Sequence, residues 1–189
     1  MNLMEYIQKD VFIIGEIGNN HNGDKEKAQQ LIDIAVDAGC SAVKFQTFRG
    51  TDIVTPIVPA DAYPGWEVDG VEFWYQFLDQ IALPFEDHKE VFTYAREKGA
   101  LPFYTPTSVP SVDVLEECDV ELYKIASMDV TNIPLLRRVA QTKKYVILST
   151  GMASSDELDR AVEILGKERL VILHCVSDYP LEYANANLN

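Results

Sequence analysis

The chain of 189 residues has few basic residues and few cysteines. Sixteen lysines and arginines stand against thirty aspartates and glutamates, which gives a formal net charge of −14. Because nucleic acids and anionic membrane surfaces attract cationic proteins, this balance argues against both as partners. The three cysteines, Cys40, Cys118 and Cys175, are odd in number and widely spaced, which argues against a disulfide framework or a zinc cluster.

Long apolar runs are also missing. No run approaches the roughly 20 residues that a membrane-spanning helix needs, and residues 1–10 lack the basic start and apolar middle of a signal peptide. We therefore expect a cytoplasmic protein. Its 47% hydrophobic and 24% charged residues fit a single globular domain with one sizeable core.

Short apolar runs alternate with amphipathic segments along the chain. The runs predict six strands, at residues 11–17, 42–48, 101–104, 122–125, 145–148 and 170–175. The segments between them predict helices at residues 25–38, 86–98, 109–117, 133–141 and 156–165, the last beginning with a capping box at Ser154. Since the strands are apolar throughout and lack clean alternation, they indicate parallel strands covered by helices, an α/β fold.

Polar residues stand at the carboxyl ends of nearly all the predicted strands. A TIM-type (β/α)8 barrel gathers its active site at that edge. An open doubly wound sheet is the alternative, but no G-x-G-x-x-G or P-loop motif is present. Six strands are visible where a closed barrel needs eight, and such barrels usually take about 250 residues. We therefore expect residues 1–189 to form a partial barrel domain of about six β/α units.

Residues 49–83 do not follow the alternation of strands and helices and form an insertion after the second strand. The segment contains Pro56, Pro59, Pro64 and Gly65 before a predicted short helix at residues 71–81. Its aromatic residues favour a small satellite core over a binding face, and a lid or a subunit contact is a further alternative. They are Tyr63, Trp66, Phe73, Trp74, Tyr75 and Phe77.

Two lysines inside apolar strands carry the strongest chemical signal. Lys44 and Gln46 are two residues apart and project to one face of their strand, and Lys124 projects from a later strand. A buried charge needs a partner or a ligand, so two ammonium groups at one edge suit an anion with a phosphate and a carboxylate. The alternative for each lysine is an ion pair with an acid such as Glu16 or Asp129. Short hydroxyls at other strand ends can donate to phosphate oxygens: Thr105, Ser127, Ser149 and Ser177.

The three histidines leave their roles open. His21 lies in a polar turn at residues 19–23 and either faces a ligand or stabilises the turn. His88 falls in the first turn of a predicted helix, and we expect it to be solvated. His174 lies inside the last apolar run, where a hydrogen-bonded core histidine is favoured over a metal ligand.

Five motifs in order closely resemble the sialic acid synthase family. They are residues 14–23 (IGEIGNNHNG), 43–47 (VKFQT), 123–127 (YKIAS), 147–152 (ILSTGM) and 173–175 (LHC), the last followed by Tyr179-Pro180. The resemblance covers nearly the whole chain apart from the insertion. It identifies a family that includes the N-acetylneuraminate, legionaminate and pseudaminate synthases without choosing among them.

The resemblance implies a condensation of phosphoenolpyruvate with the open-chain aldehyde of an N-acetylated hexosamine of the N-acetylmannosamine type. The products are a nonulosonic (sialic) acid and phosphate. It implies that Glu16, Lys44 and Lys124 are catalytic. By the same resemblance Gln46, Asp129 and Tyr179 face the sugar, with Asp129 standing where other members carry a glutamate. Phosphoenolpyruvate would be held by Lys44, Thr105, Lys124, Ser127, Ser149 and Ser177.

The resemblance further implies a divalent cation, Mn²⁺ or Mg²⁺, and a homodimer. In the family, the metal-binding histidines, strands seven and eight and a C-terminal antifreeze-like domain belong to segments beyond residue 189, so no metal ligand is assigned in this chain. Two alternatives stay open. One is a synthase of the 3-deoxy-octulosonate-phosphate type, which added basic residues for a sugar phosphate would favour, and the other is an inactive fragment or assembly partner of a synthase.

Overall fold

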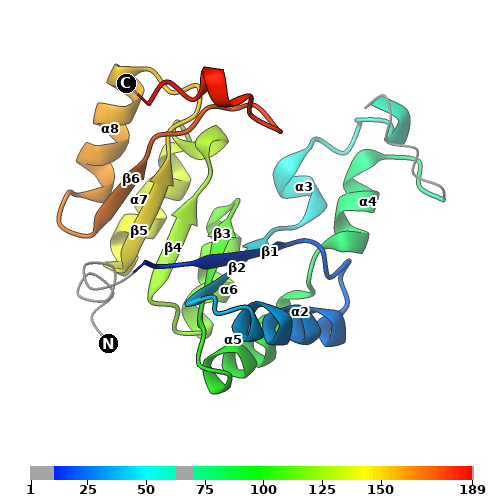
Figure 1. Ribbon diagram of the computed structural model, residues 1–189. Helices are drawn as coiled ribbons and strands as arrows, with labels where there is room; N and C mark the ends of the chain where they lie inside the picture. The colour runs from blue at the N-terminus through cyan, green and yellow to red at the C-terminus, as the bar shows by residue number, and fades with distance from the viewer. Residues whose placement is uncertain (1–10, 63–69, 189) are drawn as a thin grey trace. The chain divides into compact units, whose positions relative to one another are not determined.

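A computed structural model describes residues 11–62 and 70–188, in which strands and helices alternate (Figure 1). The strands are β1 (Ile14–Gly18), β2 (Ala42–Thr47), β3 (Leu101–Pro106), β4 (Leu122–Ile125), β5 (Tyr145–Ser149) and β6 (Leu170–Leu173). The helices between them are α2 (Lys25–Asp37), α5 (His88–Glu97), α6 (Val109–Glu117), α7 (Ile133–Thr142) and α8 (Ser155–Leu165). Across this described part of the chain, no helix is both long and apolar enough to cross a membrane.

The chain divides into two compact units, Met1–Tyr104 and Thr105–Asn189, and β3 crosses the boundary. In the first unit β1 pairs with β2 in parallel, and in the second unit β4 pairs with β5 and β5 with β6, also in parallel. Within each unit the strand order follows the chain order. Parallel strands joined in sequence by helices are the repeat of a TIM-type barrel, so the predicted α/β class is confirmed, with six strands in the described residues.

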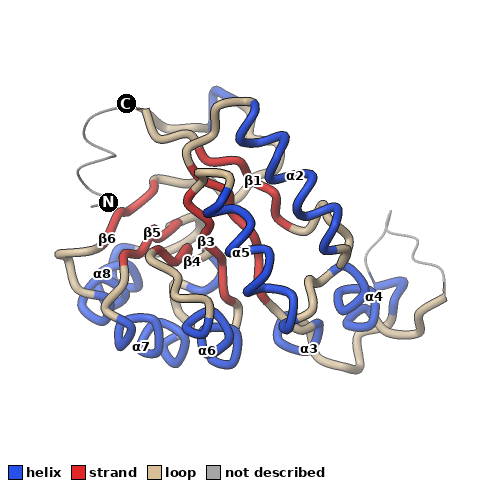
Figure 2. The backbone as a smooth tube through the Cα atoms, turned by 90° about the horizontal axis from the view of Figure 1, so that it is seen from below, coloured by secondary structure: helices blue, strands red, loops and turns tan. Residues whose placement is uncertain are grey.

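The helices of the second unit lie alongside its strands (Figure 2). Here α6 contacts α7, and α7 contacts α8. The apolar residues of both layers fill the core, with Leu115 of α6, Leu135 of α7 and Leu148 of β5 fully buried. The strands are therefore covered on their outer face, as their continuous apolar character predicted.

The predicted elements match the observed ones closely. The bounds of β4 and α6 are as predicted, and most other helix ends differ by one or two residues. Three strands stop short of a predicted end: β1 begins only at Ile14, β2 ends at Thr47, and β6 ends at Leu173. The predicted helix at residues 86–98 consists of a 3-10 turn, η2 (Phe85–Asp87), followed by α5.

The insertion forms two short helices, α3 (Gly50–Ile53) and α4 (Trp74–Ile81), and a 3-10 turn, η1 (Ala60–Ala62). The start of α4 is fixed by the side-chain oxygen of Gln76, which accepts the backbone N–H of Phe73 at 2.9 Å. Trp74 is buried with the Phe77 ring 5.1 Å away, a contact of the predicted satellite core. Tyr63 and Trp66 lie outside the described residues.

Glycine allows α4 to pack against the rest of the first unit. A Cβ atom at Gly50 would lie 2.0 Å from the carbonyl oxygen of Tyr75, and one at Gly23 would lie 2.6 Å from that of Gln80. Both distances are far below van der Waals contact, so the backbone of α4 approaches closely only because these residues have no side chain. The insertion is thereby held beside the carboxyl ends of β1 and β2.

Candidate active site

In the first unit, the parallel register of β1 and β2 places Glu16 opposite Lys44. The Lys44 Nζ lies 2.9 Å from the Glu16 Oε1, and the side chains are 12% and 54% exposed, respectively. The ion pair that was the alternative prediction for Lys44 is therefore present. Since half of the Glu16 side chain faces solvent, the pair lies at a surface that a ligand can reach.

A cavity of about 590 Å³ opens beside this ion pair. Gln46 lines it, and the amide nitrogen Nδ2 of Asn19 donates a hydrogen bond to the Gln46 Oε1 at 2.9 Å. Phe77 and Ile81 of α4 line the same cavity. The predicted sugar-binding residue Gln46 therefore faces a cavity that is bounded in part by the insertion.

In the second unit, Lys124 contacts the hydroxyl of Ser149. The Lys124 Nζ donates to the Ser149 Oγ and also to the carbonyl oxygen of Ile125, the latter at 2.8 Å. Lys124 lies opposite Ile147 in the parallel register, which brings it near the carboxyl end of β5 where Ser149 stands. The structure thus joins two of the residues predicted to hold phosphoenolpyruvate.

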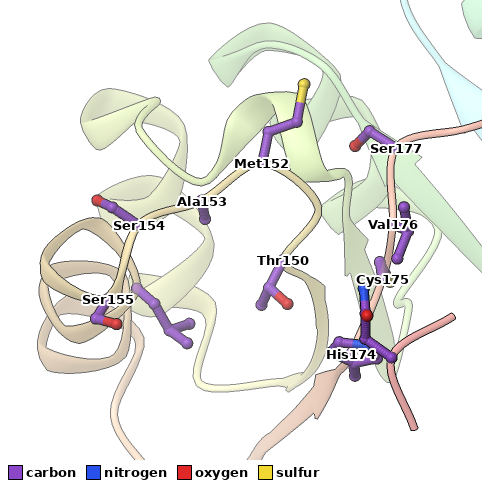
Figure 3. Close-up of a pocket in the computed structure, with 11 residues that line it drawn as sticks. Thr150, Met152, Ala153, Ser154, Ser155, His174, Cys175, Val176 and Ser177 are labelled. Carbon is purple, nitrogen blue, oxygen red and sulfur yellow. The ribbon is translucent and has the colours of Figure 1, made fainter. Parts of the chain in front are cut away.

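Two further predicted residues, Ser127 and Ser177, lie around Gly151, close to the contact of Lys124 with Ser149. The Ser127 Oγ accepts the backbone N–H of Gly151 at 2.9 Å. A Cβ atom at position 151 would lie 2.3 Å from the Ser177 Oγ and 3.1 Å from the Ser127 Oγ, so both hydroxyls surround the glycine. Beside them is a cavity of about 490 Å³ between the loop of Thr150–Ser155 and the segment that contains Ser177 (Figure 3).

Thr105, Asp129 and Tyr179 lie in different environments. Thr105 is buried at the end of β3, and Asp129 is buried in the 3-10 turn after β4. The Asp129 Oδ1 accepts a hydrogen bond from Asn132 at 3.0 Å, whereas its Oδ2 has no partner among the described residues. Burial raises the pKa of this carboxyl group. Tyr179 is 95% exposed, so a sugar-facing role for it remains a prediction.

The structure decides the environments of the three histidines. His21 is fully buried, and its Nδ1 accepts the backbone N–H of Gly23 at 3.1 Å, which is the turn-stabilising role. The expectation of a solvated His88 is wrong, because this side of α5 packs inward and the ring lies 5.3 Å from that of Tyr104. The expectation of a core His174 is also wrong: β6 ends one residue earlier, and the exposed ring contacts the Ala186 carbonyl oxygen.

Three features of these sites were missed from the sequence. Asn19 was predicted only as part of a polar turn, Gly151 was given no role of its own, and Phe77 was assigned to a satellite core in preference to a binding face. The signal available for Asn19 was its place directly after the strand that carries Glu16. No group of three His, Cys, Asp or Glu side chains that could hold a metal ion occurs in the described residues.

Fold and site together define a TIM-type β/α protein with cationic and hydroxyl donors at the carboxyl ends of its strands. Residues 31–189 match the model of the NeuB family, and the chain belongs to that family. It is 35% identical over 185 residues to the N,N'-diacetyllegionaminic acid synthase of Campylobacter jejuni, covering 95% of this chain and 55% of the relative. It is 33% identical over 183 residues to the pseudaminic acid synthase of the same species, covering 95% and 53%.

A solved structure supports the same assignment. The N-acetylneuraminic acid (sialic acid) synthetase of Leptospira borgpetersenii, crystallised with citrate, matches with a TM-score of 0.82 and 35% identity over 95% of this chain and 59% of that one. The chain spans about half the length of the curated relatives that it matches. The activity of a whole protein of this family is therefore a proposal for this chain.

Proposed function

We propose that this chain belongs to an enzyme that condenses phosphoenolpyruvate with an N-acetylated hexosamine of the N-acetylmannosamine type, forming a nonulosonic acid and phosphate. The observation that carries the proposal is the donor cluster of the second unit. Lys124, Ser149, Ser127 and the Gly151 N–H supply a charge and short donors in contacting pairs. On a chain of net charge −14, such a local set suits a small phosphorylated acid.

The reaction balances without an oxidant or reductant. The C3 carbon of phosphoenolpyruvate attacks the aldehyde carbon, and a carbon–carbon bond forms while the aldehyde oxygen takes up a proton. Water then adds at C2, and the bond between C2 and the phosphate oxygen breaks to release phosphate and the α-keto acid. Lys124 and the hydroxyls would stabilise the charge on the departing phosphate, and holding both reactants together can supply up to roughly 7–11 kcal/mol of the barrier.

The cavity of the first unit supports a neutral acceptor. It is lined by Gln46, by asparagines of the turn after β1 and by Glu16, and none of the described residues that line it is basic. A sugar phosphate would need a cation to balance its charge. This composition therefore favours an amino sugar without phosphate over a substrate of the 3-deoxy-octulosonate-phosphate type.

We also propose a cytoplasmic location, a homodimer and a divalent cation for the whole protein. Phosphoenolpyruvate and amino sugars are metabolites of the cytoplasm, which supports that compartment. The homodimer and the divalent cation, Mn²⁺ or Mg²⁺, are part of the proposal through the family to which the chain belongs. When bound, such a cation would polarise the aldehyde and activate water.

Heat denaturation with and without phosphoenolpyruvate tests the anion site. We expect the ligand to raise the melting temperature of the parent and expect Lys124→Ala to weaken binding by about 10- to 100-fold, since a hydrogen bond to a charged group contributes about 1.5–3 kcal/mol. Lys44→Ala should have a similar effect. Lys167→Ala, at an exposed position, is the matched control and should respond like the parent. An unchanged melting temperature of the parent would contradict the proposed site.

Turnover is measured separately as phosphate release in the presence of Mn²⁺ and a panel of N-acetylated hexosamines. Release with one acceptor and not with its phosphate ester would support the proposed substrate class. Protection by phosphoenolpyruvate without release from any acceptor would favour the alternative of an inactive fragment or assembly partner. The two readouts therefore separate binding from catalysis.

A further inference from the structure

The first unit contains a second cavity, of about 300 Å³, which is lined by Arg49 and is called the Arg49 cavity below. It shares no described lining residue with the cavity beside Gln46. Phe77 and Ile81 of α4 line the cavity beside Gln46, whereas Asp79 of the same helix lines the Arg49 cavity. Because successive residues of an α-helix are turned by about 100°, Asp79 faces away from Phe77. The two cavities therefore lie on different sides of α4.

The Arg49 cavity has an apolar wall. Phe48, which follows β2, and Leu83, which follows α4, line it and are each 2% exposed. Pro84 and Phe85, at the start of η2, complete the wall. Sites for small molecules begin at about 300 Å³, so a cavity of this size suits a ligand with one compact apolar group.

Arg49 brings a positive charge to this wall. Its guanidinium group lies over the Phe85 ring, 4.8 Å from the ring centre, and forms no ion pair with any residue that the structure describes. Its backbone N–H is bound separately, by the Asp52 Oδ2 at 3.1 Å. Stacking on a ring fixes the plane of a guanidinium group and leaves its N–H edge free to bind a carboxylate through two parallel hydrogen bonds.

Two carboxylates line the same cavity, Asp79 and Glu86. Asp79 is held in place by the backbone N–H of Gly50, which donates to its Oδ1 at 2.6 Å. A carboxylate can accept about four hydrogen bonds, so both groups can still bind an ammonium group. A simple anion would be repelled by the two carboxylates, and a simple cation would be repelled by Arg49. The mixture of charges therefore suits a ligand that carries both signs.

We propose that the Arg49 cavity binds a free α-amino acid with a compact apolar side chain, such as leucine. Arg49 binds the carboxylate of the ligand, and Glu86 and Asp79 bind its ammonium group. The side chain of the ligand packs on the apolar wall. This site uses none of the residues assigned to the proposed condensation, so it stands or falls independently of that activity.

Four ligands that differ by one chemical group test the recognition. They are L-leucine, isocaproate, which lacks the ammonium group, isoamylamine, which lacks the carboxylate, and glycine, which lacks the apolar side chain. Affinities are measured for the whole 189-residue chain by saturation-transfer NMR titration. We expect isocaproate and isoamylamine to bind about three- to fivefold more weakly than L-leucine, the value of an exposed ion pair. Glycine should bind at least about tenfold more weakly.

Variants of the charged residues should change these affinities selectively. Arg49→Ala should weaken L-leucine and isocaproate by about three- to fivefold but should not weaken isoamylamine, which has no carboxylate. Glu86→Gln should weaken L-leucine and isoamylamine but not isocaproate. Arg96→Ala is the matched control, because that guanidinium group also lies 4.8 Å from the centre of a ring, that of Phe92, but does not line the cavity.

This crossed pattern separates a built site from weak adsorption to the surface. Absence of L-leucine binding, equal affinities of the parent for L-leucine and either analogue, or equal effects of Arg49→Ala on all ligands would overturn the proposal. An equal loss of L-leucine affinity in Arg96→Ala would also overturn it. Arg49 and Glu86 are exposed, so both variants should keep the parental melting temperature. Arg49→Lys, which keeps the charge but not the planar group, should bind L-leucine with an affinity between those of the parent and Arg49→Ala.

Discussion

At the scale of the residue, the protonation state of a buried polar side chain depends on one or two hydrogen-bond partners, and His88 is an example. His88 is fully buried between the Pro84 carbonyl oxygen, 2.9 Å from its Nδ1, and the Thr47 hydroxyl, 3.1 Å from its Nε2. The carbonyl can only accept, so the Nδ1 carries the proton and the Nε2 accepts from Thr47. Burial lowers the pKa of His88 to about 4, and the ring is neutral at pH 7.

The neutral state of His88 predicts a loss of stability in acid. In the unfolded chain the ring takes up a proton near pH 6.5, whereas in the folded chain it does so only near pH 4. Its contribution is therefore complete above pH 6.5 and is lost as the pH falls, by about 2 kcal/mol between pH 7 and pH 5. In His88→Gln, urea unfolding should show a pH 7-to-5 decrease smaller by that amount, and an equal decrease in both proteins would contradict the assignment.

Gly151 gives a second prediction at the scale of one residue. An alanine there would push its Cβ into the Ser177 hydroxyl, 2.3 Å away, and against Ser127. Ser177 is exposed and can rotate, so we expect Gly151→Ala to lower the free energy of unfolding by no more than about 1–3 kcal/mol. The added methyl group should nevertheless abolish protection by phosphoenolpyruvate. Gly166→Ala, with open space around its Cβ but a positive φ, is a control for backbone strain and should keep protection.

At the scale of the element, α2, α6, α7 and α8 begin where the side chain of the cap residue accepts one of the first N–H groups of the helix. Ser154 caps α8 and forms a capping box with Glu157, whose carboxylate accepts the Ser154 backbone N–H at 2.8 Å. This hydrogen bond lowers the pKa of Glu157. Ser108 and Asn132 cap α6 and α7 through their side-chain oxygens alone, which accept the backbone N–H groups of Ser111 and Leu135. Such local pairs are why these starts were predictable to within one residue.

The cap of α8 predicts a measurable stability change. Replacing Ser154 by alanine removes the acceptor for the Glu157 N–H and should lower the free energy of unfolding by about 1 kcal/mol. Ser155→Ala, one residue further along and also exposed, is the matched control. Equal melting temperatures for the two variants would show that the capping box contributes nothing.

The insertion shows which features local sequence patterns predict and which they do not. The periodicity predicted a helix at residues 71–81, and α4 lies inside that range. No local pattern could show that Gly50 and Gly23, distant in sequence from the helix, would leave room for its backbone. The contact of α4 with the cavity of Gln46 is a consequence of that packing and was not predicted.

At the scale of the whole molecule, apolar side chains remain exposed on β6, the last strand of the second unit's sheet. Ile172 is 46% exposed and Leu173 is 39% exposed. An apolar edge strand tends to pair with another chain or to be covered. In the 189-residue chain, a second copy of the same chain can supply this cover.

This exposure predicts self-association that depends on concentration. Burying Ile172 in a contact between copies would contribute about 1.5–3 kcal/mol per side chain, so Ile172→Lys should weaken association by at least tenfold in sedimentation velocity. Leu188→Lys removes an exposed apolar residue outside the strands and should leave association unchanged. A parent that stays monomeric at all concentrations, or equal effects of the two variants, would contradict the prediction.

The amino-acid sequence by itself determined the alternation of strands and helices, the parallel α/β class and the polar positions at the strand ends. These depend on periodicity and caps, which act between residues at most a few positions apart. Only the tertiary structure decided that Lys44 pairs with Glu16, that Lys124 donates to Ser149 and that His88 is buried while His174 is exposed. Those outcomes depend on register and on close packing between distant segments, which no local pattern of residues encodes.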